Sequence, residues 1–217
     1  MKKWGIGCGI LAIIVIIILI LIGIAGGSYN HLVRLSQGVD KQWAQVQNVY
    51  QRRADLIPNL VNTVAGAANF EKSTLTEITA ARASVGQVKI DPNSAPTDPA
   101  KLAQFQKAQG QLTSALSRLL VVVERYPDLK ANANFQTLQA QLEGTENRIA
   151  VERGRFNEAV QAYDTAIRSF PANLYAGMFG FKEKPYFNAA PGAENAPKVQ
   201  FDFNQTQTPA TSSPAKP

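Results

Sequence analysis

Apolar side chains recur at alternating intervals of three and four residues along most of the chain. The first such stripe contains Leu32, Leu35, Val39, Trp43, Val46, Tyr50, Arg53, Ile57, Leu60 and Val64. This spacing places its members on one face of an α-helix, as in a helix bundle or coiled coil. Pro58 lies inside the stripe and lacks the amide hydrogen that an α-helix uses. We therefore expect a kink or a helix restart near residues 55–58.

Three further helical stretches follow. The second continues through Leu75 and Ile78 towards Val85, and the proline-rich and glycine-containing residues 86–100 form a loop. The third stretch, 102–123, ends before Pro127, and the fourth, 135–170, ends before Pro171. Short connections favour antiparallel neighbours, so the pattern predicts an all-α fold with an elongated antiparallel four-helix-bundle-like domain.

An uninterrupted apolar segment precedes these helices. No charged residue occurs in 4–27, about 24 positions that would extend about 36 Å as a helix, against a bilayer core of about 30 Å. We expect a retained transmembrane helix, with a cleaved signal peptide as the alternative. Lys2 and Lys3 favour a cytoplasmic N-terminus, which predicts a single-pass protein of the inner membrane with a periplasmic or extracellular body.

The composition divides the chain into five parts. A short basic N-terminus (1–3) precedes the anchor (4–27), and the helical domain spans 28–187. Residues 188–203 form an aromatic tail, in which the alternation over 198–203 resembles a half-buried strand that could pair between molecules. Residues 204–217 are mostly Gln, Thr, Ser, Ala and Pro, and we expect them to be disordered.

Polar residues interrupt the apolar stripes at Arg53, Gln109 and Glu152. Either the stripes drift and these side chains reach solvent, or Arg53 and Glu152 form an ion pair inside the bundle that fixes helix register. A second polar patch on the fourth helix could meet the third helix. Together these positions make a candidate structural network of Arg53, Glu152, Arg118, Glu124, Glu146 and Arg148.

Aromatic residues are concentrated near the end of the chain. Leu174 to Phe187 could fold over one end of the bundle and bury its rings there, or the segment could present a contact surface to a protomer, a partner or the bilayer interface. The candidate surface contains Phe179, Phe181, Tyr186, Phe187, Phe201 and Phe203.

Few residues are available for chemistry. The chain has one cysteine, Cys8, and one histidine, His31, which excludes an internal disulfide or CxxC pair and argues against the usual nucleophilic and metal centres. Glu143 and Glu146 have the spacing of bundle metal ligands but lack the histidines that such sites need. The net charge of +6 is scattered, which disfavours nucleic-acid binding. We predict no catalytic, cofactor or metal residues.

Several motifs resemble the LemA proteins of bacterial membranes. They read QRRADLIPNLV at 51–61, LSRLLVVVE at 116–124, YPDLKAN at 126–132, EGTENRI at 143–149 and AGMFGF at 176–181. The resemblance implies an N-terminal membrane helix followed by a helical, four-helix-bundle-like domain. It supplies no catalytic residues.

These observations predict a non-enzymatic, membrane-anchored helical scaffold or interaction protein of the bacterial cell envelope. Its predicted partners are the lipid bilayer, unidentified envelope proteins and a second copy of the chain. Two alternatives stay open: an envelope hydrolase or an adaptor of one, and a lipid-binding or membrane-shaping protein.

Overall fold

The computed structural model describes residues 2–66 and 70–189. Within residues 2–25, side chains are described only at positions 13–16, 19 and 23. The chain divides into two units, Met1–Phe187 and Asn188–Pro217, and the helices of the described residues all belong to the first.

The described residues form helices and loops, without a strand. The helices are α1 (Lys2–Ala65), α2 (Lys72–Gln87), α3 (Pro99–Val123), α4 (Pro127–Lys130) and α5 (Ala133–Arg168), followed by the short 3-10 helix η1 (Ala172–Leu174). The all-α prediction is therefore confirmed, although the pattern of apolar residues did not predict α4.

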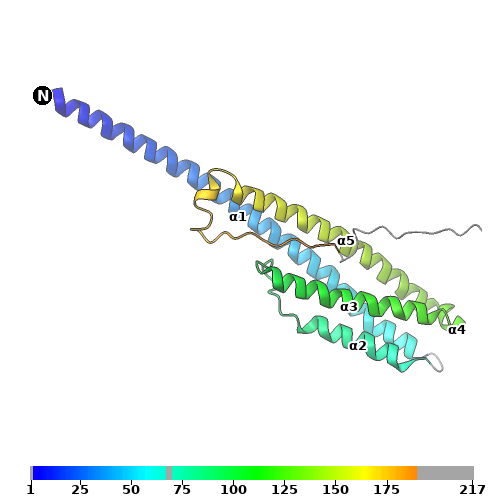
Figure 1. Ribbon diagram of the computed structural model, residues 1–217. Helices are drawn as coiled ribbons and strands as arrows, with labels where there is room; N and C mark the ends of the chain where they lie inside the picture. The colour runs from blue at the N-terminus through cyan, green and yellow to red at the C-terminus, as the bar shows by residue number, and fades with distance from the viewer. Residues whose placement is uncertain (1, 67–69, 190–217) are drawn as a thin grey trace, which may run out of the picture. The chain divides into compact units, whose positions relative to one another are not determined.

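The four long helices pack as an antiparallel bundle. α5 runs back along α1, and α2 runs against α3 (Figure 1). Ion pairs show the same direction for α2 and α3. Glu71, just before α2, pairs with Arg125, just after α3, and Glu77 of α2 pairs with Arg118 of α3. The N-terminal part of α1 extends beyond η1 (Figure 1).

Local sequence explains where the helices begin. Asp98 caps α3 by accepting a hydrogen bond from Ala100 N at 2.8 Å, with Pro99 in the first turn. Asn132 caps α5 by accepting from Asn134 N and Phe135 N. These caps satisfy amide groups that the helix itself leaves unpaired.

Two apolar cores lie along the buried stripe of α1. The first core cluster gathers α1 residues from Leu32 to Tyr50 with the C-terminal half of α5, Phe105 of α3 and the segment that follows α5. The second core cluster gathers Ile57 to Val64 with α2, the C-terminal half of α3 and the start of α5. Arg53 lies between the two along α1, at the one buried charged position of the stripe.

The expected helix restart at Pro58 is wrong, because α1 continues through it to Ala65. Proline removes the hydrogen bond that Ala54 O would accept from residue 58. Arg82 of α2 replaces this donor, since its Nε lies 3.2 Å from Ala54 O. The helix thus continues through Pro58, with a donor supplied by α2.

The described residues include no helix with an apolar stretch long enough to cross a membrane. The expected anchor, 4–27, forms the start of α1. Most of its side chains lie outside the described part of the chain.

The pairing of Arg82 with Ala54 leads to a first prediction. Arg82→Ala should lower the free energy of unfolding by about 1 kcal/mol, the net contribution of one hydrogen bond. Pro58→Ala restores an internal donor for Ala54, so Arg82→Ala should cost much less in the Pro58→Ala background. Denaturant unfolding of the four proteins measures this coupling. An equal cost of Arg82→Ala in both backgrounds would contradict the assignment of Arg82 as the replacement donor.

Candidate functional site

A buried guanidinium joins three helices at the boundary between the two core clusters. Arg53 of α1 is only 1% exposed. Its Nη1 donates to Thr113 Oγ1 of α3 at 2.9 Å and to Glu146 of α5. Its Nη2 donates to the side-chain oxygen of Gln109. We call Arg53, Gln109, Thr113 and Glu146 the polar layer.

The polar layer is closed on one side by an aromatic ring and open on the other. The guanidinium carbon of Arg53 lies 5.2 Å from the centroid of the Tyr50 ring, within the range of a cation–π contact. Burial raises the pKa of the Tyr50 hydroxyl, so the ring stays neutral at physiological pH. On the open side, the Glu146 side chain is 39% exposed and borders a groove of about 380 Å³ between α3 and α5.

The predicted pairing of Arg53 with Glu152 is wrong. Glu152 accepts hydrogen bonds from Gln42 Nε2 at 2.6 Å and from Arg155 Nη1 at 2.8 Å. Since α5 runs antiparallel to α1, Glu152 is level with Gln42, about three turns of α1 away from Arg53. Of the two alternatives, Arg53 follows the buried one, but its carboxylate partner is Glu146, six residues earlier on α5.

The other members of the predicted network lie apart from the polar layer. Arg118 pairs with Glu77 of α2 at 2.6 Å, and Glu124 pairs with Lys130 at 2.6 Å, both on the surface. Arg148 is exposed. Pairs of this kind contribute little to stability because water screens them. Gln109, which the sequence marked only as an interruption of a stripe, proves to be a partner of Arg53.

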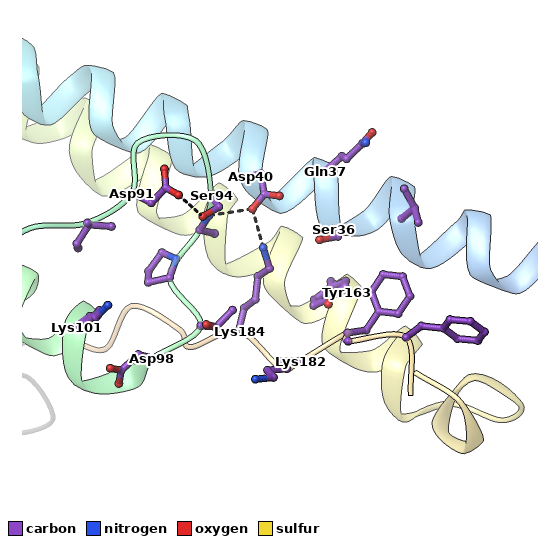
Figure 2. Close-up of a pocket in the computed structure, with 18 of the residues that line it drawn as sticks. Ser36, Gln37, Asp40, Asp91, Ser94, Asp98, Lys101, Tyr163, Lys182 and Lys184 are labelled. Carbon is purple, nitrogen blue, oxygen red and sulfur yellow. Dashed lines mark hydrogen bonds and ion pairs between the residues drawn. The ribbon is translucent and has the colours of Figure 1, made fainter. Parts of the chain in front are cut away.

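A second polar feature is a cavity of about 520 Å³ beside the N-terminal part of the bundle. It lies between α1, the loop that precedes α3 and the segment that follows η1 (Figure 2). Asp40 and Lys184 meet at its centre. Lys184 Nζ donates to Asp40 Oδ1 at 2.7 Å, and Ala95 N donates to the same oxygen at 2.9 Å.

The ion pair of Asp40 with Lys184 also helps to hold the segment that follows α5 against the bundle. Lys184 N donates to Asp164 Oδ1 of α5 at 3.1 Å, and Lys184 Nζ lies 5.7 Å from the Tyr163 ring centroid. Burial is the main reason why the pKa of the Asp164 carboxyl rises above its ordinary value. Burial also raises the pKa of the Tyr163 hydroxyl. One lysine therefore ties residues 181–187, here called the strap, to both α1 and α5.

The far end of the strap is fixed by Phe187. Its ring stacks on Trp43, with centroids 6.1 Å apart, and meets Phe156 edge-on at 5.3 Å. Asn157 bonds both backbone groups of Phe187, donating to its oxygen at 3.0 Å and accepting from its nitrogen at 2.9 Å. Phe187 is thus buried in the first core cluster, and its predicted place on a contact surface is wrong.

The remaining aromatic positions differ among themselves. Phe181 is half-buried against the first core cluster, whereas Phe179 and Tyr186 are exposed. Phe201, Phe203 and the strand-like segment 198–203 lie outside the described residues. The part of the segment up to Phe187 therefore does fold against the bundle, but it leaves some rings outside.

The carboxylates that line the cavity are engaged within the chain: Asp40 by Lys184, Asp98 by the α3 cap, and Asp91 by Asn93 N and Ser94. Within the described part of the chain, no group of three His, Cys, Asp or Glu side chains is placed to hold a metal ion.

The polar layer generates a second prediction. Glu146→Ala leaves Arg53 buried without its counter-ion and should cost about 3 kcal/mol of unfolding free energy. In a cycle with Arg53→Met, the two changes should couple by more than about 1 kcal/mol. The same cycle on Arg53 and Glu152 serves as the control and should be additive, because Glu152 has other partners. Coupling to Glu152 instead of Glu146 would refute the assignment.

Asp164 generates a third prediction, on pH dependence. A carboxyl whose folded pKa is raised favours the folded state while protonated, and this contribution is lost as pH rises through the folded pKa. Asp164→Asn keeps the oxygen that accepts from Lys184 N but does not titrate. Relative to this variant, the wild type should lose stability as pH increases from about 4. Thermal unfolding of both proteins across this range measures the difference, and a constant difference would show that Asp164 is not destabilised by burial.

Comparisons with known proteins agree with the fold and the motifs. The chain is 28% identical over 219 residues to magnetosome protein MamQ of Magnetospirillum gryphiswaldense, covering 94% of this chain and 80% of that protein. It is 26% identical over 185 residues to magnetosome protein MamQ 1 of Paramagnetospirillum magneticum, covering 76% of this chain and 66% of that protein.

Protein LemA of Metamycoplasma hominis is 24% identical over 164 residues, which cover 76% of this chain and 70% of that protein. The LemA family profile matches residues 42–201, from the first core cluster through the strap and beyond. This range includes the polar layer and most of the residues that line the cavity. The chain belongs to the LemA family.

Proposed function

We propose that this protein is a membrane-anchored helical scaffold of a bacterial cell envelope, with residues 4–27 as a single-pass anchor in the inner membrane. The observation that carries the proposal is the continuity of α1, which runs as one helix from Lys2 to Ala65. The same helix supplies the apolar segment and the central stripe of the bundle. Such a helix would connect the membrane anchor to the folded body without a flexible linker.

The described side chains of the apolar segment support the anchor. Ile13, Ile14, Val15 and Ile16 are all exposed, as is Leu19. Consecutive helix positions point about 100° apart, so the four isoleucine and valine side chains surround the whole helix. A helix that is apolar on every side needs an apolar environment on every side, and a lipid bilayer would provide it.

The body of the protein supports a scaffold more than an enzyme. The ion pairs of Asp40 with Lys184 and of Arg53 with Glu146 join the strap to α1 and α5 to α1, and both are made within the chain. We therefore propose that the bundle acts through contacts with other envelope proteins.

We propose that the bundle lies outside the cytoplasm. Lys2 and Lys3 precede the apolar segment directly, whereas the first basic residues on its other side, His31 aside, are Arg34 and Lys41. Positive charges close to the segment favour the cytoplasmic side.

The proposal predicts that the protein is integrated in the membrane and that its bundle lies outside the cytoplasm. In a Cys8→Ala background, Ala150→Cys places one exposed thiol on α5. The full chain should stay in the membrane fraction after alkaline carbonate washing. A membrane-impermeant maleimide should label it in cells whose outer barrier, if present, has been permeabilised.

The same variant labelled after complete lysis is the reference for full modification. Release by carbonate would contradict the anchor. Retention with labelling only after lysis would keep the anchor but place the bundle in the cytoplasm.

A further inference from the structure

Exposed apolar side chains are concentrated at one end of the bundle. Outside the N-terminal apolar segment, the large apolar residues described as exposed are Tyr29, Val121, Val151, Phe170, Leu174, Met178, Phe179 and Tyr186. Five of these belong to one place, where the end of α5 and the turn after it meet α1. We call Tyr29, Phe170, Leu174, Met178 and Phe179 the apolar tip.

The apolar tip exposes large apolar side chains, an arrangement that contact with water does not favour. Ala172 and Ala176 are buried in the first core cluster, whereas Leu174 and Met178 between and beside them are exposed. Met178 is 85% exposed. The small side chains therefore face the protein and the large apolar ones face outwards, the reverse of the usual distribution in a soluble protein.

Defined contacts hold the apolar tip in place. The Tyr29 ring lies 5.3 Å from the Phe179 ring and 5.5 Å from the Phe181 ring, both edge-on. Phe181 N donates to Ala176 O at 3.0 Å, which closes the turn. Gly180 makes this turn possible with a φ of 81°, a conformation that glycine adopts without strain. The outward side chains are thus presented by an ordered turn.

The position of the apolar tip along α1 indicates which environment its side chains face. Tyr29 follows the apolar segment 4–27 by two residues, about 3 Å along a continuous helix. The ring contacts of Tyr29 bring the turn to this level. If 4–27 spans the bilayer, the apolar tip lies where the hydrocarbon gives way to headgroups, the depth at which amphipathic aromatic rings are enriched.

The charged residues nearby suit the same environment. Arg34 of α1 and Lys182 of the strap are exposed, and Glu183 is engaged by Arg168 at 2.6 Å. Cationic side chains just outside an apolar patch are attracted to acidic lipid headgroups. This arrangement of an apolar centre with basic neighbours is typical of a surface that rests on a bilayer.

We propose that the apolar tip docks into the headgroup and upper acyl region of the bilayer that holds α1, giving the bundle a second membrane attachment. This inference rests on the proposed anchor. It adds that the bundle is held in a fixed orientation relative to the membrane. With α1 as the only attachment, α1 and the bundle could tilt together in the bilayer as one body. With the tip docked, the first core cluster and the cavity are held next to the membrane surface.

Site-directed spin labelling of the full chain tests the docking. In a Cys8→Ala background, Met178→Cys carries the label, in bilayers of phosphatidylcholine and phosphatidylglycerol. We expect the label to collide strongly with oxygen and weakly with an aqueous nickel complex, at a depth of about 5–10 Å. Val151→Cys is the matched control, an exposed apolar position on α5 away from the tip, and its label should contact the nickel complex.

A label at Ile16→Cys separates the two proposals. If Ile16 is in lipid and Met178 is as accessible to the nickel complex as Val151, the anchor holds and the docking is wrong. If the Met178 label is shielded from both oxygen and nickel, a protein such as a second copy covers the tip, and the docking is again wrong. If Ile16 itself contacts water, the anchor fails and the docking fails with it.

A charged variant checks that the tip itself provides the attachment. Phe170→Asp together with Leu174→Asp replaces two exposed residues, so the bundle should stay folded by circular dichroism. The acidic side chains oppose entry into the interface. The Met178 label should then gain nickel accessibility towards the value at Val151, while the Ile16 label stays in lipid. An unchanged Met178 label in the folded variant would overturn the proposal.

Discussion

The buried guanidinium of Arg53 constrains the whole bundle because it has to find partners on three helices at one level. A buried charge persists only when it is paired and hydrogen-bonded, and here α3 supplies Gln109 and Thr113 while α5 supplies Glu146. A slip of α3 and α5 by one turn along α1 would move Gln109, Thr113 and Glu146 away from the guanidinium of Arg53. The polar layer therefore fixes the register of α1 against α3 and α5.

The register of α5 on α1 determines which part of the chain packs against the N-terminal part of α1. With Arg53 opposite Glu146, antiparallel packing brings the end of α5 and the turn after it to the level of Tyr29 and Leu32. The strap then returns along the bundle, held by Lys184 at the cavity and by Phe187 in the first core cluster. The structure thus links a polar interaction near the middle of the bundle to the surface next to the apolar segment.

The sequence alone predicted the parts of this structure that depend on local pattern. Period-3.6 stripes located the four long helices, and Pro127 and Pro171 marked where α3 and α5 end. What it missed depends on register. Glu152 and Glu146 are equally plausible partners of Arg53 until the alignment of α5 on α1 is known. Pro58 was expected to interrupt α1, because the compensating donor, Arg82, lies on another helix. The burial of Phe187 in an irregular segment carries no periodic signal at all.

The fixed orientation proposed for the bundle requires α1 to be one rigid helix from the apolar segment into the bundle. The sequence Gly26–Gly27–Ser28 lies at the point where a break would be easiest, since helix kinks occur at such residues. Spin labels at Leu19→Cys and Lys41→Cys in a Cys8→Ala background report on it directly in the full chain in bilayers. A continuous helix places these positions about 33 Å apart, so double electron–electron resonance should give a single narrow distribution near this distance, broadened only by the label linkers. A broad distribution, or a population at clearly shorter distances, would show that α1 bends between membrane and bundle and would contradict a rigid connection.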